Sequence, residues 1–254
     1  MRNIAKRHQF ILERLKKEGY VKVQELSEDL GVSEVTIRKD LKELEDRKML
    51  YRNHGSASSI TSILSERHID EKEKIQIDEK RRISQAATSL LEEKDKIIIA
   101  SGTTLLSFAR EISFDKQITV ITPSVKVSLA LCNNPNIEII QLGGVVRKSS
   151  VSVTGYYAEE LLSDLVCSKL FLGIDGLDLD YGLTTSNIGE AHINQYMISV
   201  AQKIVVLADS TKFNKKGFCK ICDIDRIDQI ITDSKAPKSM IEVLEDRGIK
   251  VTLV

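Results

Sequence analysis

The sequence contains no tryptophan, and aromatic residues make up only 5% of its 254 positions. Aromatic side chains are the usual stacking platforms for single-stranded nucleic acid, so their scarcity argues against that class of binding protein. No uninterrupted apolar run approaches the ~18 residues that a membrane-spanning helix needs, and none follows the start of the chain. We therefore expect neither a signal peptide nor a membrane span.

Cysteine is also scarce, because four cysteines in a chain of this length do not make a disulfide framework. Two of them form Cys219-Lys-Ile-Cys222, but a zinc site needs a second pair, and Cys132 and Cys167 are isolated from each other. A redox motif would normally open a helix, whereas this stretch has the composition of a strand or loop. His192 is expected on a helix surface rather than at a metal or acid–base site. We expect a reduced, cytoplasmic protein without metal or cofactor.

The charge is balanced overall but not along the chain. Lys plus Arg and Asp plus Glu number 37 each, so the formal net charge is zero. Residues 1–55 hold 13 Lys/Arg against 10 Asp/Glu, and the remainder holds 24 against 27. A local positive excess of this sign suits a DNA-contacting module at the N-terminal end.

The first 55 residues have the pattern of a winged helix-turn-helix. Apolar spacing predicts helices over 4–17 and 23–30, and a third helix with a buried stripe of Ile37, Leu41 and Leu44. Gly31 suits a left-handed turn and Ser33 suits an N-cap. Residues 49–54 predict a short strand, and Gly55 predicts a turn.

In a winged helix-turn-helix the third helix enters the major groove, and the wing contacts the backbone or the minor groove. Arginine can bind guanine with two hydrogen bonds, and Ser and Thr hydroxyls can bind a phosphate or a base edge. The alternative is that Arg38, Lys39 and Lys42 form an ordinary solvated helix face and that His54 is a loop residue without a role. The candidate DNA contacts are Ser33, Glu34, Thr36, Arg38, Lys39, Lys42, Arg52, Asn53, His54 and Gly55.

The rest of the chain alternates apolar segments with helical patterns. The apolar segments are nearly continuous in Ile and Val, which is typical of strands buried on both faces. Strands are predicted over 97–100, 118–122, 137–142, 169–174, 204–208, 229–232 and 250–253, and helices over 104–112, 124–131, 158–166, 191–201 and 239–246. This alternation predicts an α/β domain with a mostly parallel sheet. We expect a DNA-binding domain over 1–57, a linker over 58–79 and a second domain over 80–254. The serine-rich stretch from Ser56 to Ser62 is loop-like, and the linker leads into a helix that starts near Asp78.

Polar turns follow several of the predicted strands. Ser101-Gly102-Thr103-Thr104 lies between a strand and a helix, where backbone N–H groups and hydroxyls can bind an anion. Ligands of open α/β sheets bind at the carboxyl ends of the strands. The alternative for Lys212 is an ordinary surface lysine. The candidate effector contacts are Ser101, Gly102, Thr103, Thr104, Ser124, Gly143, Gly144, Asp175, Gly176 and Lys212.

Ser33-Glu-Val-Thr-Ile-Arg-Lys-Asp-Leu41, with Leu44 and Arg52-Asn-His-Gly55, resembles the signature of the DeoR family of bacterial transcriptional regulators. Residues from about 80 to 233 resemble the effector domain of that family, which is similar to the ribose-5-phosphate isomerase and coenzyme A transferase superfamily. The resemblance implies that Ser101 to Thr104 hold the phosphate of a sugar or polyol phosphate, that Lys212 adds positive charge, and that Asp175 binds a ligand hydroxyl.

Four positions depart from the family pattern. Ala100 and Pro123 stand where the family usually has Asp and Asn. Val23 lies in a region that often carries Ser or Thr, and Ser56 replaces the second glycine after the wing. The first two substitutions lie in the predicted effector site.

The resemblance implies a repressor of a carbohydrate-utilisation operon that a phosphorylated sugar releases from double-stranded operator DNA. A dimer or tetramer is expected, because one winged helix contacts too few base pairs for useful specificity. The alternative is a sugar-phosphate isomerase-like enzyme with an accessory helical domain. Asp175-Gly-Leu-Asp178 is similar to an isomerase motif, but Thr184-Thr-Ser-Asn187 replaces the Lys and Gly-rich run that follows it. Proton transfer then lacks electrostatic support, so no catalytic residue is assigned.

Overall fold

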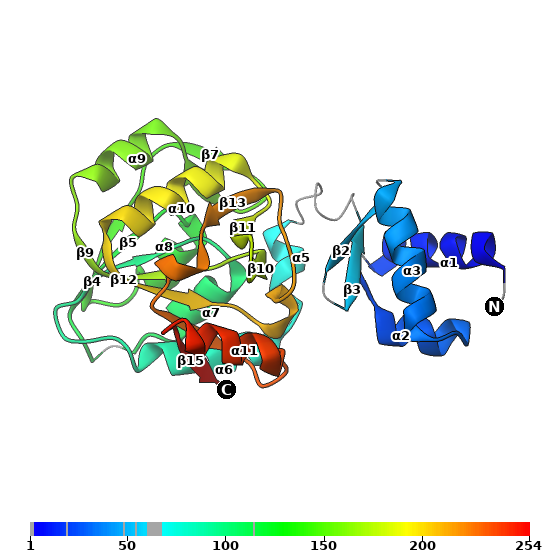
Figure 1. Ribbon diagram of the computed structural model, residues 1–254. Helices are drawn as coiled ribbons and strands as arrows, with labels where there is room; N and C mark the ends of the chain where they lie inside the picture. The colour runs from blue at the N-terminus through cyan, green and yellow to red at the C-terminus, as the bar shows by residue number, and fades with distance from the viewer. Residues whose placement is uncertain (1–2, 19, 48, 54, 60–67, 114) are drawn as a thin grey trace. The chain divides into compact units, whose positions relative to one another are not determined.

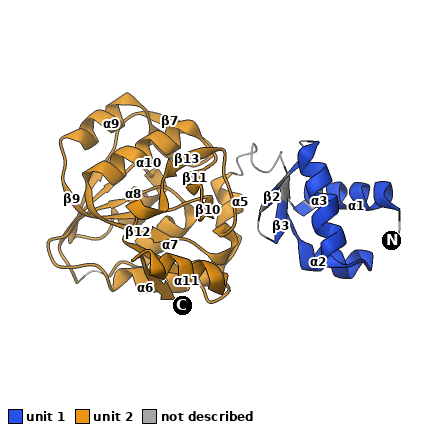
Figure 2. Cartoon of the chain, in the orientation of Figure 1, with its two compact units in different colours: residues 1–66 blue, residues 67–254 orange. Residues whose placement is uncertain are grey.

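A computed structural model describes residues 3–18, 20–47, 49–53, 55–59, 68–113 and 115–254. The chain divides into two compact units, residues 1–66 and residues 67–254 (Figure 2). Within the described ranges, no helix combines the length and the apolar character that crossing a lipid bilayer requires.

The smaller unit is a winged helix-turn-helix (Figure 1). Its core is made by one apolar stripe from each helix, with Ile11, Leu26 and Ile37 fully buried. The strands form an antiparallel sheet of order β1-β3-β2, in which β2 and β3 make the wing. The elements are α1 (Ile4–Glu18), β1 (Tyr20–Lys22), α2 (Val23–Leu30), α3 (Glu34–Asp46), β2 (Leu50–Asn53) and β3 (Ser56–Ser59).

Local capping places the turn and the start of α3 as the sequence predicts. Gly31 has a φ of 62°, and Val32 N–H donates to the carbonyl of Ser27 at 3.2 Å. The Ser33 hydroxyl accepts from Thr36 N–H at 3.3 Å. The predicted loop at 56–59 is instead strand β3, because Ala57 is fully buried in the core and pairs with Val21 of β1.

The larger unit is built on seven parallel strands, and all seven predicted strands take part. Their order in the sheet is β15-β14-β12-β9-β4-β5-β6. The strands are β4 (Lys96–Ile99), β5 (Ile118–Thr122), β6 (Ile137–Gln141), β9 (Cys167–Leu172), β12 (Ala201–Leu207), β14 (Gln229–Thr232) and β15 (Lys250–Leu253).

Helices cover both faces of this sheet. Successive strand residues point to opposite faces, so Ile97 and Ile99 share one core while Ile98 belongs to the other. Helices α6 (Ile77–Thr88), α7 (Thr103–Glu111) and α8 (Val125–Leu131) pack on the first face, and α9 (Tyr156–Ser163), α10 (Ile188–Val200) and α11 (Lys238–Asp246) on the second. The predicted α/β fold class is confirmed.

Several short elements were not predicted. Helix α5 lies inside the segment expected to be a linker, yet it belongs to the larger unit, whereas α6 starts at Ile77, next to the predicted start near Asp78. Of α5 only Ile69 is buried, so apolar periodicity gives no signal for it. Helix α5 spans Ile69–Glu73, and Cys219–Cys222, expected to be a strand or loop, forms strand β13. The other unpredicted elements are β7 (Val145–Arg147), β8 (Ser152–Thr154), β10 (Gly176–Asp178), β11 (Gly182–Thr185), η1 (Ser210–Lys212) and η2 (Ile224–Arg226).

The order of the parallel strands reverses between β4 and β9. The chain runs from β4 through β5 to β6, then crosses back so that β9 lies on the other side of β4. A crevice forms at the carboxyl ends of strands at such a switch point. The loops after β4 and β9 approach closely there, since a Cβ atom on Gly173 would lie 3.3 Å from the carbonyl oxygen of Ser101.

Candidate DNA-binding surface and effector site

Helix α3 presents most of the predicted DNA contacts. Ser33, Arg38, Lys39 and Lys42 are exposed, and Glu34 and Thr36 are half-buried. The buried stripe of the helix faces the other way, so these side chains share the solvent side. Val35, which is 72% exposed near the start of α3, is not among the predicted contacts. An exposed apolar side chain in this position can contact a thymine methyl group.

The cations of α3 are not equivalent in the DNA-free molecule. The Arg38 guanidinium lies 2.5 Å from the Glu34 carboxylate one turn earlier in the helix. Within the described part of the chain, neither Lys39 nor Lys42 forms an ion pair. A guanine contact by Arg38 therefore requires exchange away from Glu34, whereas the two lysines can meet phosphate directly.

The wing is described only in part. Arg52 of β2 donates its N–H to Glu45 at 3.0 Å, and its guanidinium lies 3.9 Å from the same carboxylate. Gly55 is exposed, with a φ of 77° that favours glycine. The side chain of Asn53 and the whole of His54 lie outside the described residues, so their predicted contacts have no structural description.

A buried ion pair fixes α3 against α1. Arg7 donates from Nε and Nη2 to the two carboxylate oxygens of Asp40, at 2.7 and 2.8 Å. The two side chains are 9% and 2% exposed. Hydrogen bonding to Asp40 raises the pKa of Arg7 against the opposing effect of burial. Because the guanidinium is planar and bound at both ends of the carboxylate, the pair fixes both the distance and the direction of the recognition helix.

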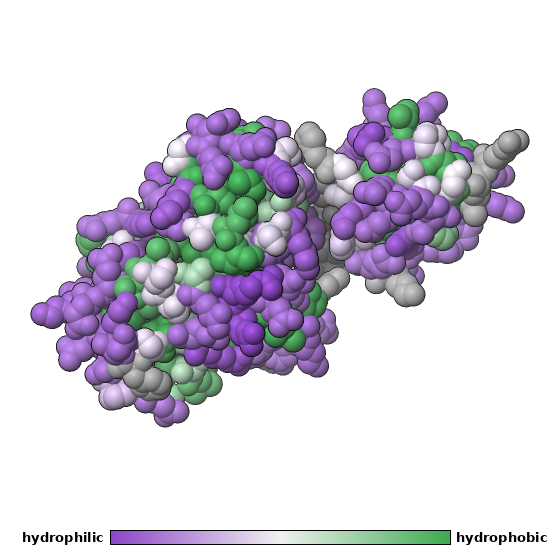
Figure 3. All heavy atoms as spheres, turned by 90° about the horizontal axis from the view of Figure 1, so that it is seen from below, coloured by the Kyte–Doolittle hydropathy of each residue, from purple (hydrophilic) through white to green (hydrophobic). Residues whose placement is uncertain are grey.

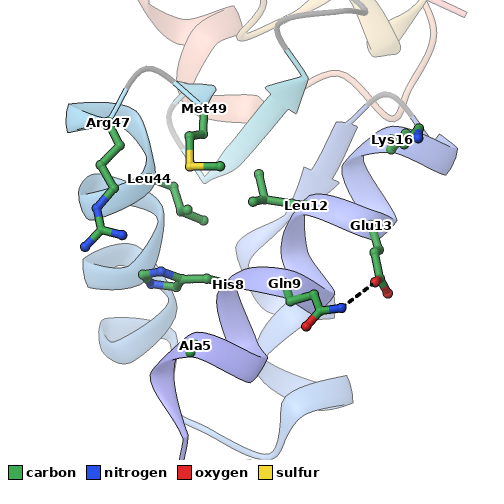
Figure 4. Close-up of a pocket in the computed structure, with 9 residues that line it drawn as sticks. All are labelled: Ala5, His8, Gln9, Leu12, Glu13, Lys16, Leu44, Arg47 and Met49. Atoms are coloured by element: carbon green, nitrogen blue, oxygen red, sulfur yellow. Dashed lines mark hydrogen bonds between the residues drawn. The ribbon is translucent and has the colours of Figure 1, made fainter.

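A groove of about 430 Å³ lies on another part of this unit, between α1 and the end of α3 (Figure 4). Its apolar floor includes Leu12, Leu44 and Met49, and Gln9 and Glu13 are hydrogen-bonded at its rim. None of the ten predicted DNA contacts lines it. The groove is therefore separate from the candidate DNA-binding surface.

In the larger unit, the predicted phosphate turn stands at the switch point of the sheet. Gly102 is the N-cap of α7, with a φ of 137° and no side-chain capping hydrogen bond. The first N–H groups of α7 therefore have no side-chain acceptor and can bind an anion. Ser101 and Thr104 are buried, whereas Gly102 and Thr103 are half-exposed.

Asp175 follows β9 and accepts hydrogen bonds from two directions. Its Oδ1 accepts from the Lys72 ammonium at 2.8 Å, and its Oδ2 accepts from Ser186 N–H at 3.1 Å and from the Thr185 hydroxyl at 3.3 Å. Burial would raise the pKa of Asp175, yet Lys72 and Lys212 hold it well below its usual range. Asp175 is therefore an ionised acceptor, suited to a ligand hydroxyl.

Glu190 connects three elements at the same edge. It accepts from the Ser101 hydroxyl at 3.1 Å and from Arg147 of β7 at 2.9 Å. Burial and the nearby Asp175 raise the pKa of Glu190, although Arg147 opposes this. His192, two residues further along α10, is exposed, as the sequence predicts.

A buried lysine, Lys80, contacts the backbone of the segment that carries Lys72. Its ammonium donates to the carbonyl oxygens of Lys72 and Ile75, both at 2.6 Å. Burial lowers the pKa of Lys80 to about 8, with Lys212 and Lys72 acting in the same direction and Asp209 and Glu73 against it. Lys72, Lys80, Arg147 and Glu190 were all missed as site residues.

Three of the predicted effector contacts, Ser124, Gly144 and Gly176, also have structural roles, and a fourth, Gly143, has none that the structure shows. Ser124 is buried and caps α8 by accepting from Val127 N–H at 3.3 Å. A Cβ atom on Gly144 would lie 2.7 Å from the carbonyl oxygen of Thr154, and one on Gly176 would lie 2.5 Å from that of Lys215. Gly143 is exposed before β7. Their contact with an effector stays a prediction.

Comparison with known proteins gives the family. Residues 7–63 match the DeoR-like helix-turn-helix domain, and residues 75–234 match the DeoR C terminal sensor domain. The chain is 36% identical over 252 residues, 98% of its length and 94% of the relative, to a putative aga operon transcriptional repressor of Escherichia coli O157:H7. The chain belongs to the DeoR family.

A second DeoR-like relative is an HTH-type transcriptional regulator of Bacillus subtilis (strain 168), 35% identical over 99% of this chain and 97% of the relative. Among solved structures, ribose 5-phosphate isomerase A of Methanocaldococcus jannaschii covers 54% of each chain with a TM-score of 0.41 and 17% identity. That score carries no argument about function. This DeoR-family chain is a DNA-binding transcriptional regulator, and the isomerase-like alternative is not supported.

Proposed function

We propose that this regulator represses a carbohydrate-utilisation operon and releases its operator when a phosphorylated sugar or polyol binds the larger unit. The observation that carries the proposal is the open N-terminus of α7 at the switch point of the sheet, where Lys72 and Lys212 influence the same carboxylate. The relatives include the glycerol-3-phosphate regulon repressor of Escherichia coli (strain K12), which is 28% identical over 249 residues.

The charges of the candidate site suit a ligand with a dianionic end and a hydroxylated end. Backbone N–H groups of α7 and the ammonium groups of Lys80 and Lys212 favour a phosphate. The carboxylates of Asp175 and Glu190 accept hydrogen bonds and so favour hydroxyl groups. The proposed effector residues are Ser101, Gly102, Thr103, Thr104, Asp175 and Lys212. Ser124, Gly143, Gly144 and Gly176, which also follow strands of the sheet in the sequence, complete the proposed set.

Effector-site variants should lose the response to ligand while keeping DNA binding. Thr103→Ala and Lys212→Ala should each weaken the binding of a sugar phosphate by roughly tenfold or more, because each removes a hydrogen bond to a charged group. Isothermal titration calorimetry against a panel of sugar and polyol phosphates measures this. Lys238→Ala, an exposed lysine of α11, is the matched control. Parental affinity in both site variants would refute the site.

DNA-surface variants should separate base contacts from phosphate contacts. Arg38→Ala should cost about 1–3 kcal/mol of operator binding if Arg38 contacts a guanine. Lys39→Ala should weaken operator and random DNA alike and reduce the salt dependence. Fluorescence anisotropy at fixed salt measures both, with Lys16→Ala of α1 as the control. Operator affinity unchanged in Arg38→Ala and Lys39→Ala would contradict the proposed surface.

We also propose that the regulator acts in the cytoplasm as a homo-oligomer. One winged helix covers only a short half-site, so specific binding needs a second copy. Hydrophobic residues gather in a patch on the larger unit in the view of Figure 3. Helix α9, which lies at the top of the larger unit in Figure 1 and so faces away from the viewer in Figure 3, also exposes Tyr156, Tyr157 and Leu161. The limits of the DNA-binding domain, residues 1–57, and of the effector-binding domain, residues 80–254, also remain predictions.

A further inference from the structure

Helix α5 is attached to the larger unit mainly by ion pairs. Asp70 and Glu73 both pair with Lys126 of α8, at 2.5 and 3.2 Å, and Glu73 also pairs with Arg110 of α7 at 2.7 Å. One backbone hydrogen bond, from Ile69 N–H to Ser149, adds to these at 2.7 Å. Ile69 is the only buried side chain of the helix. Ionic attachment of this kind can rearrange when a new charge arrives, whereas a packed apolar face cannot.

Lys72 connects α5 to the candidate effector site. Its ammonium lies 2.8 Å from Asp175, a partner 103 residues away in the chain, and the two side chains are 30% and 24% exposed. Both side chains are therefore partly accessible to a ligand at the carboxyl edge of the sheet. The ammonium of Lys80 donates to the Lys72 carbonyl, so the C-terminal end of α5 is tied to the same cluster.

We propose that Lys72 is an exchangeable effector ligand, which pairs with Asp175 in the empty site and transfers to the anionic group of a bound effector. This rests on the proposed function. A phosphate dianion offers more negative charge and more acceptor oxygens than one carboxylate, so Lys72 is drawn towards it. Asp175 then accepts a ligand hydroxyl in place of the lysine. The structure thus assigns Lys72 two alternative partners.

The exchange changes the position of α5 as well as the ligand contacts. Lys72 lies in the last turn of a five-residue helix that Asp70 and Glu73 hold to α7 and α8. Moving the ammonium from Asp175 to a phosphate pulls on those ion pairs. Occupancy of the site therefore changes the position of α5, the first described helix of the larger unit. Lys72 is in this sense a positioning residue for the response to effector.

The test uses the full chain, with inorganic phosphate as the probe. Hydrogen-exchange mass spectrometry follows peptides covering residues 68–76, and anisotropy follows release from an operator duplex selected by the protein from random DNA. In the parent, phosphate should alter exchange in 68–76 and weaken operator binding by at least fivefold. Lys72→Met should abolish both effects and weaken phosphate binding by roughly tenfold. Lys72→Arg should retain both effects and the binding of phosphate, because it keeps the positive charge.

Two further variants make the result specific. Lys74→Met, an exposed lysine at the end of the same helix, should behave as the parent. Asp175→Asn should weaken the empty-site pairing of Lys72 and so raise exchange in 68–76 without phosphate. If phosphate acts equally on the parent and on Lys72→Met, the inference is overturned and the proposed site survives. If phosphate and the sugar-phosphate panel act on neither protein, the proposed function fails with it.

Discussion

Asp40→Ala should destabilise the smaller unit by about 3–5 kcal/mol, the usual cost of removing one partner of a buried ion pair. Arg7 would keep its charge, since a guanidinium does not lose its proton in a protein. Its Nε and Nη2 would then be left buried without the two carboxylate oxygens they bond at 2.7 and 2.8 Å. Because this pair fixes α3 on α1, operator affinity should fall as well.

Hydrogen exchange resolves the two units separately. Peptides from α1 and α3 should lose protection in Asp40→Ala, while peptides from the seven-stranded sheet serve as the internal reference. Asp46→Ala, at an exposed position in the last turn of α3, is the matched variant and should leave protection unchanged. Parental protection of α1 and α3 in Asp40→Ala would show that the pair does not hold the recognition helix.

The buried Lys80 should make the larger unit more stable as the pH rises from about 8 to about 10.5. Burial lowers the pKa of Lys80 from 10.5 to about 8, so in this range the folded state releases a proton that the unfolded state keeps. Stability rises with pH wherever the unfolded state binds more protons. Lys72 and Glu73 of α5 and Asp209 and Lys212 at η1 are the charged groups that influence it.

Comparison with Lys80→Met isolates this effect from other titrations. Urea unfolding of both proteins at pH 7.5, 9 and 10.5 should show the parent gaining on the order of 3 kcal/mol relative to the variant. Lys74→Met, an exposed lysine, should show no such pH-dependent difference from the parent. A constant difference between the parent and Lys80→Met across this range would mean that Lys80 titrates as an exposed lysine.

The strands and helices were predictable where burial leaves a local pattern. The seven strands of the parallel sheet are short segments rich in apolar residues, and their predicted limits differ from the observed ones by at most three residues at either end. The capping roles of Gly31 and Ser33 were predictable because each residue ends or begins the helix next to it in the sequence. Strand β3 was missed because Ala57 is the one buried side chain that the structure describes in a serine-rich segment.

The candidate effector site was predictable only in its backbone turns. Ser101 to Thr104 and Asp175 follow predicted strands, so their position at the carboxyl edge follows from a parallel sheet. The cationic side chains that pair with the carboxylates of the site come from distant parts of the sequence. Lys72 is 103 residues from Asp175, and Arg147 is 43 residues from Glu190. Such pairings depend on β9 lying beside β4 and on the hairpin of β7 and β8, neither of which has a local sequence signal.

Operator DNA and a phosphorylated effector should bind to different conformations of this regulator. Calorimetry should titrate a sugar phosphate from the panel into the free protein and into the protein saturated with its selected operator duplex. We predict that DNA weakens effector binding by about 5–150-fold and that effector weakens DNA binding by the same factor. Equal effector affinity in the two titrations, or pentose-phosphate turnover that is lost in Asp175→Asn, would contradict the account.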